Sequence, residues 1–192
     1  MREIPLFPLN TVLFPGGPLP LRIFETRYVD MVSRCMREGT GFGVVLIRQG
    51  AEAGTPARFA EVGTEARIVD FTRLEDGLLG ITCRGGGRFH VLESWRAADG
   101  LNMGRVEERG SEAAVPLPSQ HAHLAEALRR VLPELGESYA YVEPAFDDAA
   151  WVGHRLAELL PLDLPARQVL LEMDDPLERI AVLSPLIRLD PA

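Results

Sequence analysis

The histidines His121 and His123 are the only closely spaced imidazoles in the sequence. A metal site needs both rings on one face of their element, but positions i and i+2 of a helix point about 200° apart. The two cysteines, Cys35 and Cys83, stand far from this pair in sequence. We therefore interpret the histidines as surface residues and the cysteines as buried apolar side chains, and we expect no metal site and no cofactor.

All 20 basic residues are arginine, and the sequence contains no lysine. A Walker A loop therefore lacks its phosphate-binding lysine, a Ser-Lys peptidase dyad lacks its base and a Schiff-base enzyme lacks its amine. The six serines include no G-x-S-x-G elbow. No enzyme class is supported, and the remaining alternative is a hydrolase that pairs His90 or His154 with a distant serine or carboxylate.

The sequence Arg84-Gly85-Gly86-Gly87-Arg88 is the one candidate for a phosphate-binding loop, since glycine lets backbone N–H groups approach an anion. No helical pattern follows the glycines, so we favour a bulged β connection. An RNA-binding module is an alternative function because arginines recur in adjoining predicted strands, at Arg84, Arg88, Arg96, Arg105 and Arg109. The formal net charge of −8 and the 7% aromatic content make nucleic acid an unfavoured partner.

The elements that must position these residues follow from the apolar pattern, which alternates in short runs before about residue 110 and has helical spacing after about residue 119. One helix, Glu25 to Arg37, should interrupt the first part with an apolar stripe that includes Met36. Asp76-Gly77 should form a hairpin turn. Strands are expected at Ile4 to Leu9, Leu19 to Phe24, Gly43 to Ile47, Val62 to Phe71, Leu78 to Cys83, Arg88 to Trp95 and Leu101 to Glu107.

The second part contains several residues that are typical of helix N-termini. The helices there are expected to begin at Ser119, at Asp147 or Asp148, at Pro165 and at Pro176. The acidic doublets Asp147-Asp148 and Asp174-Asp175 are interpreted as helix caps rather than as acid/base pairs. The first of these helices should bury Val131 on its apolar stripe.

The fold class predicted from these elements is α+β, with a β-rich lobe containing one helix, followed by a small helical bundle. The chain of 192 residues is long enough to bury such a core. The expected organisation is a β-rich lobe at 1–110, a linker at 111–118 and a helical lobe at 119–192. The apolar N-terminus is broken by prolines and has no signal-peptide core, so we expect a cytoplasmic protein with no membrane partner.

Several segments taken together resemble the N-terminal substrate-recognition domain of the Lon ATP-dependent protease, in a free-standing form. The resemblance starts with IPLFPLNTVLFPGG at Ile4 to Gly17 and LPLRIFETRYVDMV at Leu19 to Val32. It continues through FGVVLI, VGTEARIVDF and LEDGLLGITCRGGGRFHV, and ends with LPLDLPARQVLLEMDDPLERI at Leu160 to Ile180. Nearly the whole chain is covered in order.

This resemblance implies a PUA-like architecture for the β-rich lobe and a role in holding protein substrates. The matched sequence ends before the ATPase and peptidase parts of the full protease, so we expect a non-enzymatic module. Within the matched motifs Phe14 and Phe24 are expected to be core residues.

The predicted function is binding of unfolded or extended polypeptide, with a separate protease as a possible second partner. Two structures could accept a peptide, namely a groove between the lobes or an edge strand of the open sheet. The candidate peptide-binding residues lie on the loop after Leu13 and at the start of the first helix. They are Phe14, Pro15, Gly16, Leu19, Pro20, Glu25, Thr26, Arg27 and Tyr28.

Overall fold

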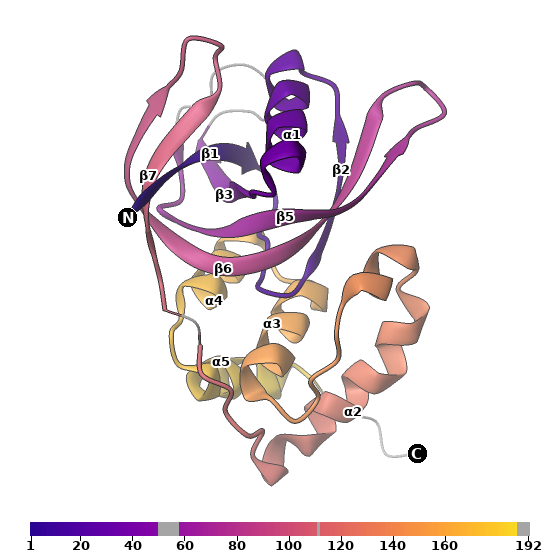
Figure 1. Cartoon of the computed structure of the whole chain (residues 1–192). Coiled ribbons are helices and arrows are strands. Elements are labelled where there is room, and N and C mark those ends of the chain that lie inside the picture. Colours follow the sequence, from indigo (N-terminus) through magenta and orange to yellow (C-terminus); the bar gives the residue numbers. More distant parts are fainter. Residues whose placement is uncertain (50–57, 111, 188–192) are drawn as a thin grey trace.

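The computed structural model describes residues 1–49, 58–110 and 112–187. Ser111 of the predicted linker and residues 188–192 of the predicted helical lobe lie outside the described residues. The β-rich part comes first and the helices follow (Figure 1). Its elements are β1 (Arg2–Leu9), β2 (Pro18–Ile23), α1 (Thr26–Glu38), β3 (Phe42–Gln49), β4 (Arg58–Phe59), β5 (Val62–Arg73), β6 (Leu79–Arg96) and β7 (Asn102–Glu108).

The helical lobe packs beneath the strands in Figure 1. Its elements are the 3₁₀ turn η1 (Ser119–His121), α2 (Ala122–Val131), η2 (Leu132–Glu134), η3 (Glu137–Tyr141), α3 (Ala149–Leu159), α4 (Leu164–Glu172), α5 (Pro176–Leu183) and η4 (Ser184–Leu186). The predicted α+β class, with one helix among the strands and helices after them, is confirmed.

Five strands close into a barrel. Antiparallel pairs join β1 to β7, β7 to β6, β6 to β5 and β5 to β3, and a parallel pair, with Leu6 opposite Gly43, joins β3 back to β1. The expectation of an open sheet is therefore wrong. Within the described residues, β2 and β4 each have one strand partner, β6 and β3 respectively, so they are the strands with a free edge.

The barrel interior is filled by a few large side chains. Leu6 and Phe89 are fully or almost fully buried there, with Ile4, Val45, Val91 and Val106 around them. Glycines on β3 and β7 make the room: a Cβ at Gly43 would lie 2.6 Å from Phe89 Cζ, and one at Gly104 would lie 2.7 Å from Leu6 Cδ1. A small barrel accommodates large interior side chains only where facing positions are small.

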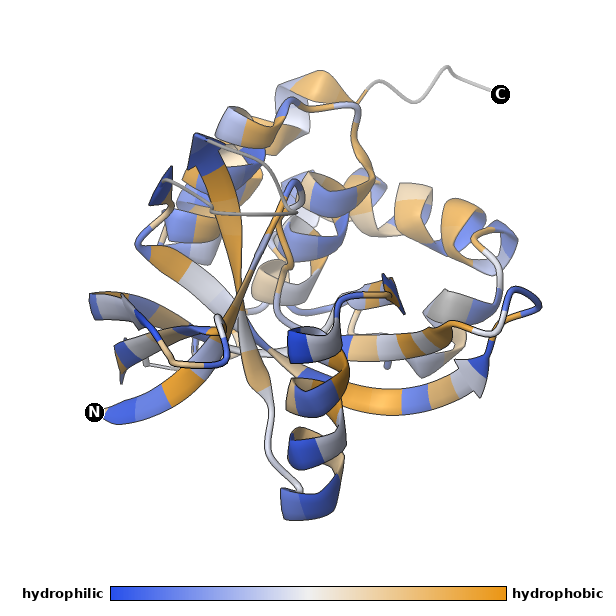
Figure 2. Cartoon of the chain, turned by 90° about the horizontal axis from the view of Figure 1, so that it is seen from above, coloured by the Kyte–Doolittle hydropathy of each residue, from blue (hydrophilic) through white to orange (hydrophobic). Residues whose placement is uncertain are grey.

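A second core lies between the barrel, β2 and helix α1. Hydrophobic and hydrophilic residues alternate along the strands in Figure 2, as expected where one face of a strand is buried. Helix α1 ends at Gly39, whose φ of 65° suits glycine. Its predicted stripe is confirmed for Tyr28, Met31, Val32 and Cys35.

Two apolar side chains near α1 differ from the prediction. Met36 is 40% exposed because it lies in the last turn, where it borders a surface cavity with Val69 and Phe71. Phe24 is 63% exposed because it lies in the connection between β2 and α1. The helical spacing of Met36 and the apolar side chain of Phe24 predicted both residues as core, but no helix or strand of the described residues packs over either of them.

The third core joins the strands to the helices. Val12, Phe14, Leu46 and Val62 from the β-rich part share it with α2, α3, α4 and α5. Val115 and Leu117, from the predicted linker, pack against the same cluster. The two parts therefore share a core, and their division at 110 and 119 stays a prediction.

The predicted acidic caps are confirmed at two helices. Asp148 accepts a hydrogen bond from Ala150 N at 3.1 Å, and Asp175 accepts one from Leu177 N at 2.8 Å. Ser119 instead opens the 3₁₀ turn η1 without a side-chain cap. Val131 is 45% exposed, since it is the last residue of α2.

Candidate functional site at the junction of barrel and helices

The glycine triplet lies within one continuous strand. The two strands predicted around it form β6, and a bulge places Arg88 opposite Thr64 but Gly85 opposite Ala66. Gly16 N donates to Gly85 O and Gly85 N donates to Gly17 O, both at 2.8 Å. A Cβ at Gly85 would lie 2.1 Å from Phe14 O, so only glycine allows the loop before β2 to approach this closely.

The same loop is held from the helical side by a buried arginine. Arg155 of α3 is 0% exposed, and its Nη2 donates to Pro15 O at 2.9 Å and to Glu158 Oε2 at 3.1 Å. Tyr139 of η3 donates to the other oxygen of Glu158. Burial raises the pKa of Glu158, whereas the charge of Arg155 favours the ionised carboxylate. The loop is thus fixed between β6 and α3.

A larger ionic cluster joins β6 to the end of α4. Arg88 donates to Leu171 O at 2.8 Å and to Met173 O at 2.7 Å, and its Nη2 lies 2.9 Å from Glu112 Oε1 and 3.0 Å from Asp174 Oδ1. Carbonyls at a helix C-terminus have no partner within the helix. Arg88 therefore satisfies the end of α4 and ties it to the barrel.

Arg179 of α5 completes this cluster. It binds Glu112 through two hydrogen bonds of 2.9 and 2.7 Å and donates to Leu170 O at 2.9 Å. Burial alone would raise the pKa of Glu112, but the nearby His154 ring and the hydrogen bonds from Arg179 outweigh it and lower the pKa to about 2. Burial lowers the pKa of His154 to about 4, so this imidazole is neutral near pH 7.

A cavity of about 290 Å³, which we call the glycine cavity, lies beside this cluster. Both lobes line it. Its lining residues are Pro15, Gly16, Gly86, Gly87, Arg88, Gly110, Glu112, Asp148, Ala150, Trp151 and His154.

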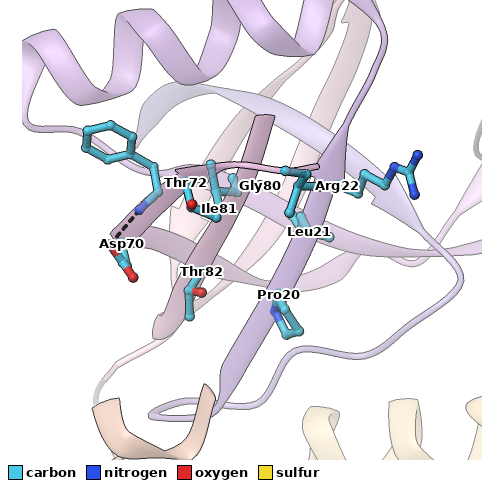
Figure 3. A pocket seen from close by; sticks show the side chains of 10 residues that line it. Pro20, Leu21, Arg22, Asp70, Thr72, Gly80, Ile81 and Thr82 are labelled. Carbon is cyan, nitrogen blue, oxygen red and sulfur yellow. Dashed lines mark hydrogen bonds between the residues drawn. The ribbon is translucent and has the colours of Figure 1, made fainter. Parts of the chain in front are cut away.

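A second hollow, the outer groove, crosses β2, β6 and β5 on the face shown in Figure 3 and has a volume of about 320 Å³. Its lining residues are Pro20, Leu21, Arg22, Asp70, Phe71, Thr72, Leu74, Gly80, Ile81 and Thr82. Pro20, Thr82 and Asp70 stand side by side in the strand register. A neighbouring hollow of about 490 Å³ lies between Pro18, Pro20 and Tyr139.

Exposed contacts bridge this side of the junction. Tyr141 donates from its hydroxyl to Asp70 Oδ2 at 3.0 Å, and Arg84 Nη1 lies 2.9 Å from Glu143 Oε1. The Glu143 side chain is 81% exposed. The junction is therefore closed by buried arginines on one side and crossed by solvated pairs on the other.

The nine predicted peptide-binding residues occupy two places. Pro15 and Gly16 line the glycine cavity, and Pro20 lines the outer groove. Glu25, Thr26 and Arg27 lie at the start of α1, at the far end of the six-residue strand β2. The remaining three, Phe14, Leu19 and Tyr28, have buried side chains.

The start of α1 is a separate polar corner. Arg27 Nη2 lies 2.7 Å from Glu25 Oε2, Arg27 Nη1 donates to Gly100 O at 2.8 Å, and its guanidinium lies 4.8 Å from the ring centre of Tyr28. These contacts fix the entry to α1 against the β6–β7 connection. Exposed Thr26 is the residue of this corner with most access to a ligand.

The arginines that suggested RNA binding are engaged with acceptors. Arg84, Arg88 and Arg109 lie within 3.0 Å of carboxylates of the helical part, and Arg105 lies 2.9 Å from Glu93. Arg96 donates to Gly100 O. Phosphate contacts need arginines free to face a backbone, so the observation that motivated this alternative is removed.

The other chemical candidates are also placed. His121 Nδ1 lies 3.2 Å from Ser184 Oγ, and the described part of the chain holds no cluster of three or more His, Cys, Asp or Glu side chains suited to a metal. His154 Nε2 lies 3.5 Å from Glu112 Oε1 and His90 Nε2 lies 3.4 Å from Glu61 Oε2. Neither contact includes a nucleophile, so nothing among the described residues supports a hydrolase built on His90 or His154.

The residues that sequence reasoning missed as parts of a site are the buried Glu112 and Arg179 side chains and the partly buried Trp151. None has a local signal, because each acquires its role from partners distant in the sequence. A closed barrel with helices packed on one side, and with a hollow between the two, defines the fold class. No helix among the described residues is long and apolar enough to cross a membrane.

Comparison with known proteins agrees with this class. The family model of the ATP-dependent protease La (LON) substrate-binding domain matches residues 3–188. The chain belongs to this family. A crystal structure of a Lon N-terminal domain protein from Xanthomonas campestris has 41% sequence identity and a TM-score of 0.79, and the match covers 98% of this chain and 100% of that one.

More distant relatives include whole proteases. Lon protease 2 of Myxococcus xanthus is 28% identical, and the match covers 96% of this chain but only 23% of that protease. Lon protease of Escherichia coli K12 is 26% identical, and the match covers 96% of this chain and 24% of that protease. This chain therefore spans about a quarter of these relatives. The N-terminal domain of the Mycobacterium avium complex Lon protease, at 18% identity and a TM-score of 0.64, shares the fold, with 95% and 96% of the two chains covered.

Proposed function

We propose that this protein binds unfolded or extended polypeptide in the glycine cavity between its two lobes and along the outer groove of the β-rich lobe. The observation that carries the proposal is the course of one segment, Pro15 to Arg22, which borders the glycine cavity at its start and the outer groove at its end. Both hollows have apolar and polar walls, as peptide-binding surfaces do. Family membership supports the same function.

Addition of a peptide strand to β2 is the less favourable route. Gly85 N donates to Gly17 O, so alternation directs the backbone groups of Leu19 and Leu21 toward β6 and those of Pro18 and Pro20 toward the free edge. Proline has no N–H, so this edge lacks donors at both positions. A bound chain is better held by side chains across the groove than by a backbone ladder.

The test is calorimetric titration with a permanently unfolded, reduced and alkylated model protein. Exchange of exposed Pro20 for Asp should weaken binding about tenfold, because a carboxylate in the groove must lose hydration when the peptide covers it. The matched control is Val169→Asp, since Val169 is 55% exposed on α4 and borders neither hollow. Equal losses in both variants would contradict the placement.

The second part of the predicted site is tested separately. Thr26→Asp changes the exposed residue at the start of α1 without touching either hollow. A loss of affinity comparable to that of Pro20→Asp would show that a bound chain also follows β2 to Glu25, Arg27 and Tyr28. Unchanged affinity would limit the site to the junction.

We expect no ATPase and no intrinsic peptidase activity from this chain. ATP hydrolysis in P-loop enzymes needs the loop lysine, and a Ser-Lys dyad needs an amine that can lose its proton, which arginine cannot do. The measurement is hydrolysis of ATP and casein by protease-free material. A rate that scales with this protein would refute the expectation. Delivery of bound chains to a separate cytoplasmic protease is the accompanying proposal for its partner.

A further inference from the structure

The glycine cavity has open walls at positions where other residues would carry side chains. Gly87 and Gly110 have no heavy atom within 4 Å of where a Cβ would lie, and neither has a positive φ. The cavity borders the bulge of β6 on one side and the first turn of α3 on the other, which Ala150 and Trp151 contribute. A side chain at either of these exposed glycines would therefore meet open space at the border of the cavity.

The charged groups in the wall are already matched. Arg88 engages two carbonyls and two carboxylates, and Glu112 is bound by both Arg88 and Arg179. Asp148 accepts hydrogen bonds from Ala150 N and Val115 N, so it caps α3 and fixes the linker. An anion would meet two carboxylates here, and a cation would meet Arg88. The phosphate interpretation of the glycine triplet therefore fails, and an uncharged ligand is favoured.

Two residues that line the cavity carry a buried polar atom without a hydrogen-bond partner in the described part of the chain, Trp151 Nε1 and His154 Nε2, and the second lies 3.5 Å from Glu112 Oε1. The indole Nε1 of Trp151 is buried and has no hydrogen-bond partner among the described residues. An indole N–H can only donate, and leaving a buried donor unsatisfied costs free energy. The wall around it also offers the apolar surfaces of Pro15 and Ala150. The group that completes this site is an apolar one with a hydrogen-bond acceptor.

From these observations we propose that the glycine cavity takes one uncharged apolar side chain of a bound polypeptide, whose backbone carbonyl accepts the hydrogen bond from Trp151 Nε1. A volume of about 290 Å³ is near the lower end for ligand pockets and suits one large side chain with its peptide group. This inference rests on the proposed function and assigns the residue class that anchors the chain.

The first experiment observes the indole N–H directly. The chain has two tryptophans, Trp95 and Trp151, so a Trp95→Phe background leaves one indole cross-peak in a ¹⁵N–¹H spectrum. Trp95 lies near the end of β6 and does not line the cavity. N-acetyl-leucine amide at millimolar concentration should shift that cross-peak. N-acetyl-aspartate amide and N-acetyl-arginine amide should leave it in place, and an equal shift with either would overturn the proposal.

The second experiment fills the cavity. Gly87→Leu adds a side chain where there is open space, so the fold should be retained, and this is checked by thermal melting. It should abolish the shift caused by the leucine probe and weaken binding of the unfolded model protein about tenfold or more. Gly87→Ala, which leaves most of the volume free, is the matched control and should change affinity by less than about threefold.

The outcomes separate the inference from the proposed function. If the model protein binds wild type and Gly87→Leu equally well, the anchor is wrong while polypeptide binding stands. If the leucine probe shifts the Trp151 cross-peak but no unfolded chain binds at high micromolar concentration, the proposed function is wrong. The assignment of an uncharged apolar ligand to the cavity then still stands. If neither probe nor polypeptide binds, both are wrong.

Discussion

Arg84 and Arg88 are four residues apart on β6, and both reach across the junction to the helical lobe. The side chain of Arg88 is 3% exposed and binds two backbone carbonyls as well as two carboxylates. That of Arg84 is 35% exposed, and its carboxylate partner, Glu143, is 81% exposed. The same residue type on the same strand is therefore structural on one side of the junction and solvated on the other.

This difference indicates how the two sides divide their roles. The buried side fixes the orientation of the lobes, because breaking it would leave charges and carbonyls without partners in a region that excludes water. The exposed side can exchange its contacts for those of a ligand at little cost, because water replaces each lost partner. The outer groove lies on the exposed side, and the glycine cavity lies between the two.

The largest expected effect tests this division directly. Arg88→Met should lower the free energy of unfolding by about 3–5 kcal/mol, since it removes one partner of a buried ion pair and leaves Leu171 O without its side-chain donor. Arg84→Met should lower it by less than about 1 kcal/mol, since its ion pair is exposed. Urea denaturation of both variants measures the difference.

Equal costs for the two substitutions would contradict the comparison. A large loss for Arg84→Met would mean that the exposed side also holds the lobes, and the outer groove would then be an unlikely place for a ligand to displace contacts. A small loss for Arg88→Met would mean that Arg109 and Arg179 support the end of α4 without it.

The next effect concerns protonation on the buried side. His154 has a pKa of about 4 in the folded protein against an ordinary value of 6.5, because burial disfavours the charged ring. The unfolded chain therefore binds the proton first as pH falls from 6.5 toward 4. Stability should be lost over that interval by roughly 3 kcal/mol. Unfolding free energies measured between pH 7 and 4.5 should show this slope.

His154→Gln should remove most of the slope, whereas His90→Gln should keep it, since His90 has an exposed side chain beside Glu61. The interval ends at pH 4.5 because Glu112 has an ordinary pKa of 4.5 and a folded pKa of about 2. Its own contribution is fully present above 4.5 and is lost only below it. An unchanged slope in His154→Gln would assign the effect to other groups.

Much of the fold could be predicted from local chemistry. The Asp76-Gly77 hairpin, the stripe of α1 and the caps Asp148 and Asp175 all depend on residues close in sequence, and all are present. Barrel closure could not be predicted, because the pairing of β1 with β3 depends on Gly43 and other small residues making room for side chains from distant strands.

The candidate site was predictable only where backbone chemistry marks it. Pro15, Gly16 and Pro20 were found because proline and glycine signal an unusual chain path, and they border the two hollows. Arg88 was considered only as a ligand of phosphate or RNA, which requires an exposed side chain, and a charged residue is ordinarily exposed. Burial of a charge is decided by its partners, here Glu112 and the end of α4, and these meet it only after folding.

The smallest effect concerns the Tyr141 hydroxyl, which donates to Asp70 in the wall of the outer groove. Tyr141→Phe removes the hydrogen bond to Asp70 and keeps the ring, and both residues are exposed. Water can replace either partner, so the free energy of unfolding should fall by less than about 1 kcal/mol. Urea denaturation measures this loss, and the loss for Arg88→Met, measured in the same way, is the reference. A loss approaching that of Arg88→Met would mean that the groove is closed by a contact as costly as those on the buried side, and a polypeptide could then enter only by unfolding part of the junction.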